Sequence, residues 1–396
     1  MATNREQETM SDTAPLSFDL ALPALTLEGG ARVDPHRARG WRWGPEEGPV
    51  VLLVHALTGD AEAGGPRGWW RPVIGPGRAL DPARHRLLCF NNLGSCYGTS
   101  GPADPGFPTR LDDRRFPIPA PYGKGARAEA EARLPATITS WDQARSILLA
   151  LDALEIGTVH LATGGSLGGM IALCLAVLAP DRFRRVATFG ATGRASPWQI
   201  GWNHVGRQLV LLDPVRGLEL ARQVGHMTYR AEAGLEDRQG RGMGADAALE
   251  AAGAAWSPRG AYAVETYLEH QGTRLRERFD PRAYLVQLGA MDHHDLDRHP
   301  GPPDPGETWD PDGPWGLDRI RAAILAVGID SDRLFSPTEM AELAAALRDR
   351  GVDARYREMR SLHGHDAFLI EWGPVAGLLE EALGMPAPDQ TTERGS

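Results

Sequence analysis

"LATGGSLGGM", residues 161–170, places a single serine among four glycines directly after a short apolar run. Residues 164–168 match the pattern G-x-S-x-G, and the apolar helical pattern "GMIALCLAVLA" follows at once. Glycine and serine are also common in loose surface turns. A strand before the motif and a helix after it instead indicate a strained corner that holds a nucleophile, with glycine at 164 and 168 where larger side chains would collide. We therefore predict that Ser166 is a nucleophile.

Short apolar runs bounded by turn residues recur along the chain at a spacing typical of parallel strands separated by helices. One helical pattern begins with Ser140 as its predicted N-cap, and another begins at the N-cap Ser336 with Glu339 as capping-box partner. This alternation predicts an α/β fold, a mostly parallel sheet with helices on both faces. The predicted strands are residues 50–57, 85–93, 158–165, 186–192, 323–329 and 354–359.

The alternation stops between residues 194 and 290, where the pattern is mostly helical. This stretch is predicted to be a helical lid inserted into the core, because covers over active sites are commonly built from such segments. The core is then predicted to comprise residues 16–193 and 291–385. We expect residues 1–15 and 386–396 to be disordered, and the Pro- and Gly-rich stretches 97–137 and 296–316 to be irregular loops.

Composition narrows the class of partner. The 396 residues carry a net charge of -10 with no basic cluster, which favours a small-molecule substrate over nucleic acid or a membrane surface. No run approaches the length of a membrane span, and the first residues lack the apolar segment of an export signal.

The three cysteines lack the spacing of a disulfide framework or zinc site and suit a reducing cytoplasm. No motif for a metal, a flavin or a nicotinamide is apparent, so we expect no cofactor.

A serine hydroxyl needs a histidine to take its proton and a carboxylate to orient that histidine. In a fold of this kind the acid and the histidine follow later strands, in that order. Asp330 and Asp332 both follow the strand 323–329, and His363 and His365 both follow the strand 354–359. We prefer Asp332 because it lies further past its strand. His365 is preferred because Gly364 and Asp366 flank it in a tight loop.

Stabilising the tetrahedral oxygen requires two backbone N–H donors. One is predicted to be the amide of Leu167, directly after the serine. The turn "VHALTGD" (54–60) after the first strong strand should supply the other, and Leu57 is the residue we expect to do so. His55 in this turn is interpreted as a packed histidine that holds the turn in place.

Together these residues resemble the homoserine O-acetyltransferase family of α/β-hydrolase-fold acyltransferases, from about residue 40 to residue 385. The stretches that carry the resemblance are "HALTGD", "NNLGSCYGTSGP", "GGSLGGM", "GLELARQVGHMTYR", "TYLEHQGTRLRERFD", "AMDHHD", "IDSDRLFSP" and "HGHDAFL". The resemblance implies an α/β-hydrolase fold and assigns Ser166 as nucleophile, Asp332 as orienting acid and His365 as general base.

The resemblance also implies an amino-acid site at Arg222, Tyr229 and Asp366. A guanidinium can hold the substrate carboxylate, and a carboxylate can hold its ammonium group. Arg222 and Tyr229 lie seven residues apart, about two helical turns, so they should share a helix face. From the residues alone, a surface ion pair for Arg222 and a core position for Tyr229 would be the preferred interpretation.

The implied reaction is a ping-pong transfer of an acetyl group from acetyl-CoA, a co-substrate, to L-homoserine for methionine synthesis, by a cytoplasmic homodimer. Three alternatives stay open at this point. The donor could be succinyl-CoA, the acceptor could be L-serine, or the same triad could belong to a plain esterase.

Overall fold

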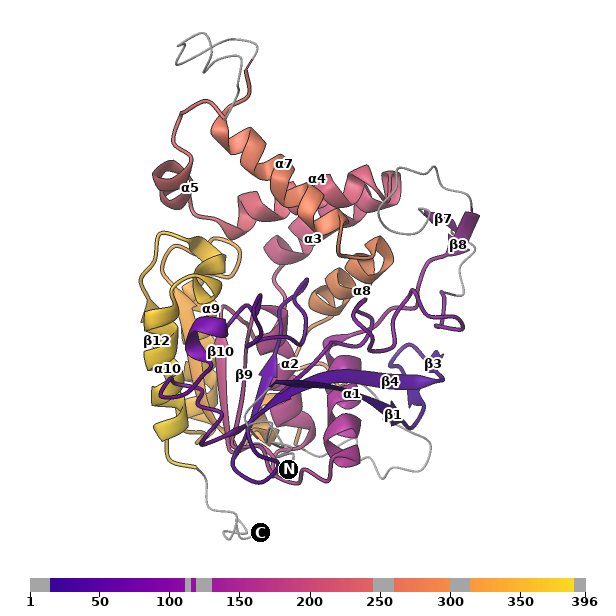
Figure 1. Cartoon of the computed structure of the whole chain (residues 1–396). Helices are drawn as coiled ribbons and strands as arrows, with labels where there is room; N and C mark the ends of the chain where they lie inside the picture. Colours follow the sequence, from indigo (N-terminus) through magenta and orange to yellow (C-terminus); the bar gives the residue numbers. More distant parts are fainter. Residues whose placement is uncertain (1–14, 111–114, 119–129, 245–259, 300–313, 388–396) are drawn as a thin grey trace, which may run out of the picture.

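The computed structural model describes residues 15–110, 115–118, 130–244, 260–299 and 314–387. Its centre is an eight-stranded sheet in the order β1-β4-β6-β5-β9-β10-β11-β12 (Figure 1). The last six strands in this order pair in parallel, whereas β4 runs antiparallel to both of its neighbours, β1 and β6. Their bounds are β1 Leu16–Leu22, β4 His36–Trp43, β5 Val50–Val54, β6 Arg86–Phe90, β9 Leu161–Gly165, β10 Arg185–Phe189, β11 Ala323–Ile329 and β12 Ala354–Met359.

All six strands predicted from apolar runs are present, although most are shorter than predicted. The sequence did not reveal β1 and β4. Every residue of β5, β9 and β11 is buried, which is typical of parallel strands covered on both faces. In β4, by contrast, buried and exposed residues largely alternate along "HRARGWRW". A search for unbroken apolar runs overlooks such a half-exposed antiparallel strand.

Helices cover both faces of the sheet, as predicted. One apolar cluster includes α1 (Ser140–Ala153), α2 (Leu167–Leu178) and α9 (Pro337–Asp349), and a second includes α10 (Trp372–Gly384). The predicted capping box of Ser336 and Glu339 is confirmed at the start of α9. The predicted cap at Ser140 is wrong. Thr139 is the N-cap of α1, because its side chain accepts a hydrogen bond from the amide of Asp142.

Five described helices lie between β10 and β11, within the stretch predicted to be an insertion. Figure 1 shows them stacked above the sheet. They are α3 (Pro197–Leu212), α4 (Arg216–Tyr229), α5 (Glu232–Arg238), α7 (Ala263–Arg276) and α8 (Pro281–Asp292). The last of them ends two residues beyond the predicted limit of residue 290. In the rest of this text, "the insertion" means these five helices and their connections.

The turn from β9 into α2 is the strained corner that the sequence predicts. Ser166 has φ 54° and ψ -130°, in a region that residues other than glycine rarely adopt. A Cβ atom at Gly164 would lie 2.3 Å from the carbonyl oxygen of Val54, and one at Gly168 would lie 2.1 Å from the same atom. Glycine at both positions therefore lets the corner pack against the end of β5.

Some predictions fall partly outside the described residues, namely the disordered ends and parts of the two loops. Within 97–137, the short strands β7 (Arg115–Ile118) and β8 (Ala130–Arg133) pair, so that stretch is not wholly irregular. The remaining described strands are β2 (Leu25–Thr26) and β3 (Arg32–Val33), and short 3-10 helices span Arg71–Val73, Gly316–Arg319 and Gly364–Leu369. Over the described ranges, no helix is both long and apolar enough to cross a membrane.

Candidate active site

His365 and Asp332 form a buried hydrogen-bonded pair. Nδ1 of His365 lies 2.6 Å from Oδ2 of Asp332, and both side chains are almost fully buried. The other carboxylate oxygen of Asp332 accepts hydrogen bonds from the amides of Leu334 and Phe335, each at 2.9 Å. The acid is therefore held from both sides, and it fixes the orientation of the imidazole.

The alternative acid, Asp330, and the alternative base, His363, do not take part in this pair. The carboxylate of Asp330 accepts a hydrogen bond from the amide of Ser361 and is exposed. His363 lies near Glu371, with its Nε2 atom 3.8 Å from the carboxylate. The structure thus pairs the two residues preferred from the sequence and leaves the two alternatives apart.

His365 and Ser166 lie on the wall of one cavity, and the Nε2 atom of His365 is available to act on the serine. Both residues line a cavity of about 180 Å³. The His365 ring is stacked on Phe335 at 4.6 Å between centroids and meets Phe368 edge-on. Its Nε2 atom is buried and has no hydrogen-bond partner among the described residues. An unpartnered imidazole nitrogen on a residue that lines the same cavity as a serine can serve as that serine's general base.

Two opposing influences act on the pKa of His365. Burial alone lowers it, because the charged imidazolium loses solvation. The negative charge and hydrogen bond of Asp332, with a contribution from Asp366, outweigh burial and raise the pKa above its ordinary value of 6.5.

The turn at residues 55–59 is held by hydrogen bonds on several sides. The amide of Gly59 donates to the carbonyl of Ala56 at 2.9 Å. The amide of Asn92 donates to Nε2 of His55, so the proton of this neutral ring is on Nδ1, which donates to the carbonyl of Ala56. Burial lowers the pKa of His55, and the interpretation of this residue as a packed histidine is confirmed.

The two predicted oxyanion donors lie at the ends of two neighbouring strands. Leu57 lines the cavity beside Ser166, and Leu167 is the first residue of α2. Because β5 and β9 pair in parallel, the loops that follow them meet at the same edge of the sheet.

All three predicted substrate-binding residues line the same cavity. The guanidinium carbon of Arg222 lies 5.9 Å from the centre of the Tyr229 ring, so both side chains project from one face of α4, as their spacing predicts. The hydroxyl of Tyr229 is hydrogen-bonded to that of Tyr284. Asp366 differs from the expectation, since its carboxylate lies 3.2 Å from the guanidinium of Arg230. A substrate ammonium group would therefore compete with Arg230.

Sequence reasoning gave no role to several other residues of this cavity, among them Trp69, Arg278 and Met291. Arg278 and Met291 fall within stretches that carry the family resemblance, but no spacing rule points to either residue. Their places in the cavity depend on contacts between segments far apart in the chain.

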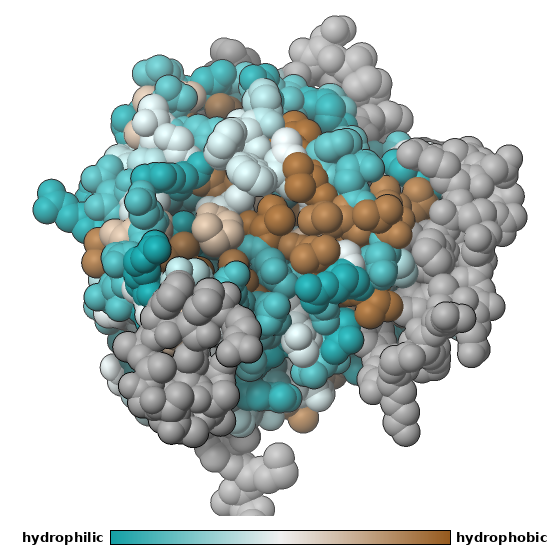
Figure 2. Space-filling model, turned by 90° about the horizontal axis from the view of Figure 1, so that it is seen from above, coloured by the Kyte–Doolittle hydropathy of each residue, from teal (hydrophilic) through white to brown (hydrophobic). Residues whose placement is uncertain are grey.

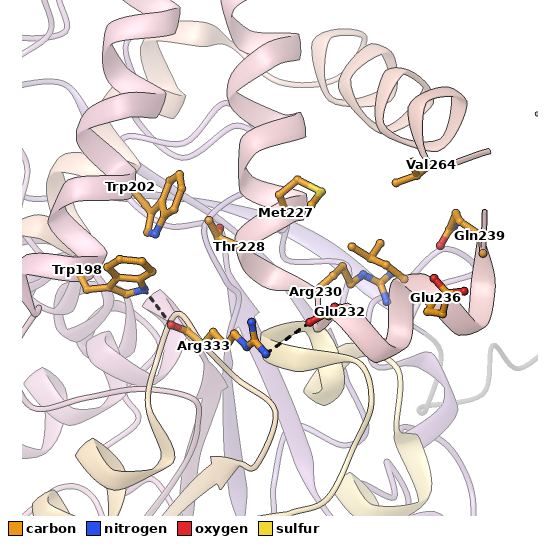
Figure 3. Close-up of a pocket in the computed structure, with 12 residues that line it drawn as sticks. Trp198, Trp202, Met227, Thr228, Arg230, Glu232, Glu236, Gln239, Val264 and Arg333 are labelled. Carbon is orange, nitrogen blue, oxygen red and sulfur yellow. Dashed lines mark hydrogen bonds and ion pairs between the residues drawn. The ribbon is translucent and has the colours of Figure 1, made fainter. Parts of the chain in front are cut away.

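A second cavity, of about 360 Å³, lies between α3, α4, α5, α7 and the segment at Arg333 (Figure 3). Trp198 donates a hydrogen bond from its indole nitrogen to the carbonyl of Arg333, and the Arg333 side chain lies 3.9 Å from Glu232. Arg230 lines this cavity and pairs with Asp366 of the first, so this ion pair lies between the two.

In the parts of the chain that the structure describes, no three His, Cys, Asp or Glu side chains are grouped so that they could hold a metal ion.

Comparison with known proteins defines the class and then the family. A family model of the alpha/beta hydrolase fold matches residues 49–371. Together with the sheet order and the strained serine corner, this match makes the chain an α/β-hydrolase-fold enzyme. A homoserine O-acetyltransferase from Moorella thermoacetica is 36% identical over 366 residues, which cover 86% of this chain and 87% of that protein. The chain belongs to the homoserine O-acetyltransferase family.

Solved structures agree on the fold. The crystal structure of a homoserine O-acetyltransferase from Staphylococcus aureus matches with a TM-score of 0.70 and 25% identity, covering 95% of this chain and 98% of that one. An acetylester hydrolase from Corynebacterium glutamicum also matches with a TM-score of 0.70, at 17% identity, covering 93% of this chain and 96% of that one. At that identity the likeness is one of fold alone.

The raised pKa of His365 predicts a pH profile. Acylation of Ser166 by p-nitrophenyl acetate requires neutral His365, so its rate should fall as the pH drops through a pKa above 6.5. Replacing Asp366 by asparagine removes a negative charge that favours the imidazolium, so the acid limb should move to lower pH. The control Asp330→Asn should leave the limb in place. A wild-type limb at or below pH 6.5, or an upward shift in Asp366→Asn, would contradict the assignment.

Proposed function

We propose that the chain transfers an acetyl group from acetyl-CoA to the hydroxyl of L-homoserine, in two half-reactions joined by an acyl-enzyme at Ser166. The observation that carries the proposal is the shared cavity. Ser166, the paired His365 and the cationic side chain of Arg222 all line the same cavity. The substrates come from the family to which the chain belongs. We also propose that this acetyl transfer is a step of methionine synthesis, as the sequence resemblance implies.

In the first half-reaction, Nε2 of His365 takes the proton of the Ser166 hydroxyl as its oxygen attacks the thioester carbonyl. The negative charge that develops on the carbonyl oxygen is stabilised by the amides of Leu57 and Leu167, and the latter lies at the N-terminus of α2. When the tetrahedral intermediate collapses, the bond to sulfur breaks and the CoA thiolate takes the proton from His365. Ser166 is left as an acetyl ester.

In the second half-reaction, the carboxylate of homoserine binds the guanidinium of Arg222. Its ammonium group binds Asp366 in competition with Arg230. His365 then takes the proton of the homoserine hydroxyl, whose oxygen attacks the ester. Ser166 leaves as an alkoxide and regains its proton from His365, so the enzyme returns to its starting state.

Transfer rather than hydrolysis requires that the ester meets little water while it waits for homoserine. Ser166 and His365 are 6% and 3% exposed, respectively. Helix α4 of the insertion contributes Arg222 and Tyr229 to the wall of their cavity. This cover supports acyl transfer over the plain esterase.

A steady-state comparison tests the substrates. We expect acetyl-CoA with homoserine to give the highest kcat/KM among the four pairings of acetyl-CoA or succinyl-CoA with homoserine or serine. Thiol release from acetyl-CoA without acceptor should be much slower than with homoserine. A preference for succinyl-CoA or for serine would replace that substrate in the proposal, and fast thiol release that homoserine leaves unchanged would favour an esterase.

Arg222→Ala should separate the half-reactions. Loss of the guanidinium removes a charged hydrogen-bond partner of the homoserine carboxylate, which contributes about 1.5–3 kcal/mol, or roughly 10- to 150-fold in kcat/KM for homoserine. The rate of thiol release in a single turnover with acetyl-CoA should change far less. Equal losses in both half-reactions would contradict the role of Arg222 in acceptor binding.

The proposal extends to a cytoplasmic homodimer without a tightly bound cofactor. The thiols of Cys89, Cys96 and Cys174 are free, which suits a reducing compartment.

The proposed dimer is supported by exposed apolar residues on the insertion. Val205 and Leu212 lie two turns apart on α3 and are 41% and 83% exposed. Figure 2, a view from above, shows a band of hydrophobic surface across this end of the molecule. Sedimentation equilibrium should give twice the chain mass, and a monomer at micromolar concentration would contradict the dimer.

A further inference from the structure

Two arginines of the insertion reach the same residue of the turn that carries Leu57. Nη1 of Arg278 donates a hydrogen bond of 2.7 Å to the carbonyl oxygen of Thr58. Arg222 approaches the side chain of the same residue, with its Nη1 atom 3.5 Å from Oγ1. Arg278 lies in the short connection between α7 and α8. The insertion is therefore tied to the turn directly after the predicted oxyanion donor.

The same nitrogen of Arg278 also donates to the hydroxyl of Tyr97 at 2.6 Å. Burial raises the pKa of Tyr97 to about 12, so the phenol is neutral and acts as an acceptor here. Tyr97 is held by its own contacts. Its carbonyl accepts a hydrogen bond from the side-chain amide of Asn91, and its ring meets Phe279 edge-on at 5.8 Å. Arg278 thus bridges the turn to a second anchored loop.

That second loop is itself bonded to the turn. The side-chain oxygen of Asn91 accepts from the amide of Ala61, and the amide of Asn92 donates to His55. The turn at residues 55–59 is consequently bonded to the core through His55 and through Ala61, just after it. The hydrogen bond from Arg278 to Thr58 adds a further restraint, which comes from the insertion.

We propose that Arg278 is a positioning residue that holds this turn, so that the amide of Leu57 is aimed at the oxygen of the acylation transition state. Donors that are already aligned stabilise developing charge most effectively, because they need no reorganisation during the reaction. A charge-assisted hydrogen bond to the Thr58 carbonyl is a strong restraint on a short turn. The inference rests on the proposed role of Leu57 and gives the insertion a part in the first half-reaction.

Arg278 could alternatively bind an anionic part of the acyl donor. It lines the catalytic cavity, is exposed, and forms no ion pair with a carboxylate of the described residues. The two roles differ in what they predict for a small uncharged ester. A positioning role affects every acyl donor equally, whereas donor binding affects only the CoA ester.

The experiment compares acylation of Ser166 by p-nitrophenyl acetate and by acetyl-CoA in Arg278→Met. Both acylation rates should fall by the same factor, about tenfold, which is less than the roughly 100- to 1,000-fold loss when an oxyanion donor is removed. KM for both donors should stay the same. Arg278→Lys should restore part of the rate, because an ammonium group can still donate to the Thr58 carbonyl. Arg276→Met is the matched control, since that side chain binds Glu219 and not the turn.

Unchanged acylation by both donors in a folded Arg278→Met enzyme would overturn the inference. A loss confined to acetyl-CoA would also overturn it and would assign Arg278 to donor binding. If the methionine variant does not fold, Arg278→Ala takes its place, because it also lacks a donor to the Thr58 carbonyl. Acylation by both donors at the wild-type rate in that variant refutes the role. The ester assay needs neither CoA nor homoserine. An enzyme that forms the acyl-enzyme but rejects those substrates would therefore refute the proposed function and still test Arg278.

Discussion

The close approach of the β9–α2 corner to the end of β5 is the constraint on which the site depends. The carbonyl of Val54 lies where a Cβ atom at Gly164 or Gly168 would have to be. Between these glycines, Ser166 adopts a positive-φ backbone conformation that costs about 1–3 kcal/mol. Strands β5 and β9 are fully buried and α2 is buried over nearly its whole length, and their packing offsets this cost. As a result, one hydroxyl stands at the edge of the sheet, beside the first amides of a helix.

The parallel sheet then brings the partners of this hydroxyl together. Asp332 follows β11 and His365 follows β12, and these neighbouring strands pair in parallel. Between β9 and β11 lies β10, and Gly190 directly follows it. A Cβ atom at Gly190 would lie 3.1 Å from the ring of His365 and 3.3 Å from the carboxylate of Asp332. The absent side chain leaves room for this hydrogen-bonded pair, which raises the pKa of His365 in spite of its burial.

Much of this arrangement could be predicted from the sequence, because the relevant signals are local. The strand before Ser166, the helix after it, and the positions of Asp332 and His365 behind later strands follow from patterns within a few residues. Strand β4 was missed since its residues largely alternate between buried and exposed. The pairing of Asp366 with Arg230 and the bond from Arg278 to Thr58 could not be foreseen, because each joins segments more than 100 residues apart. Gly190 has no motif at all, and its role emerges only from the packing around it.

The insertion has two relations to this core. Through α4 it adds Arg222 and Tyr229 to the wall of the catalytic cavity, and through Arg278 it reaches the turn that carries Leu57.

The most direct test of the account is intact-protein and peptide mass spectrometry of enzyme mixed with acetyl-CoA. Without acceptor, one acetyl group should appear on the peptide that contains Ser166, and homoserine should remove it as O-acetylhomoserine. Product formation without any acetylated intermediate, or acetylation at another residue that homoserine discharges, would contradict a reaction centred on Ser166.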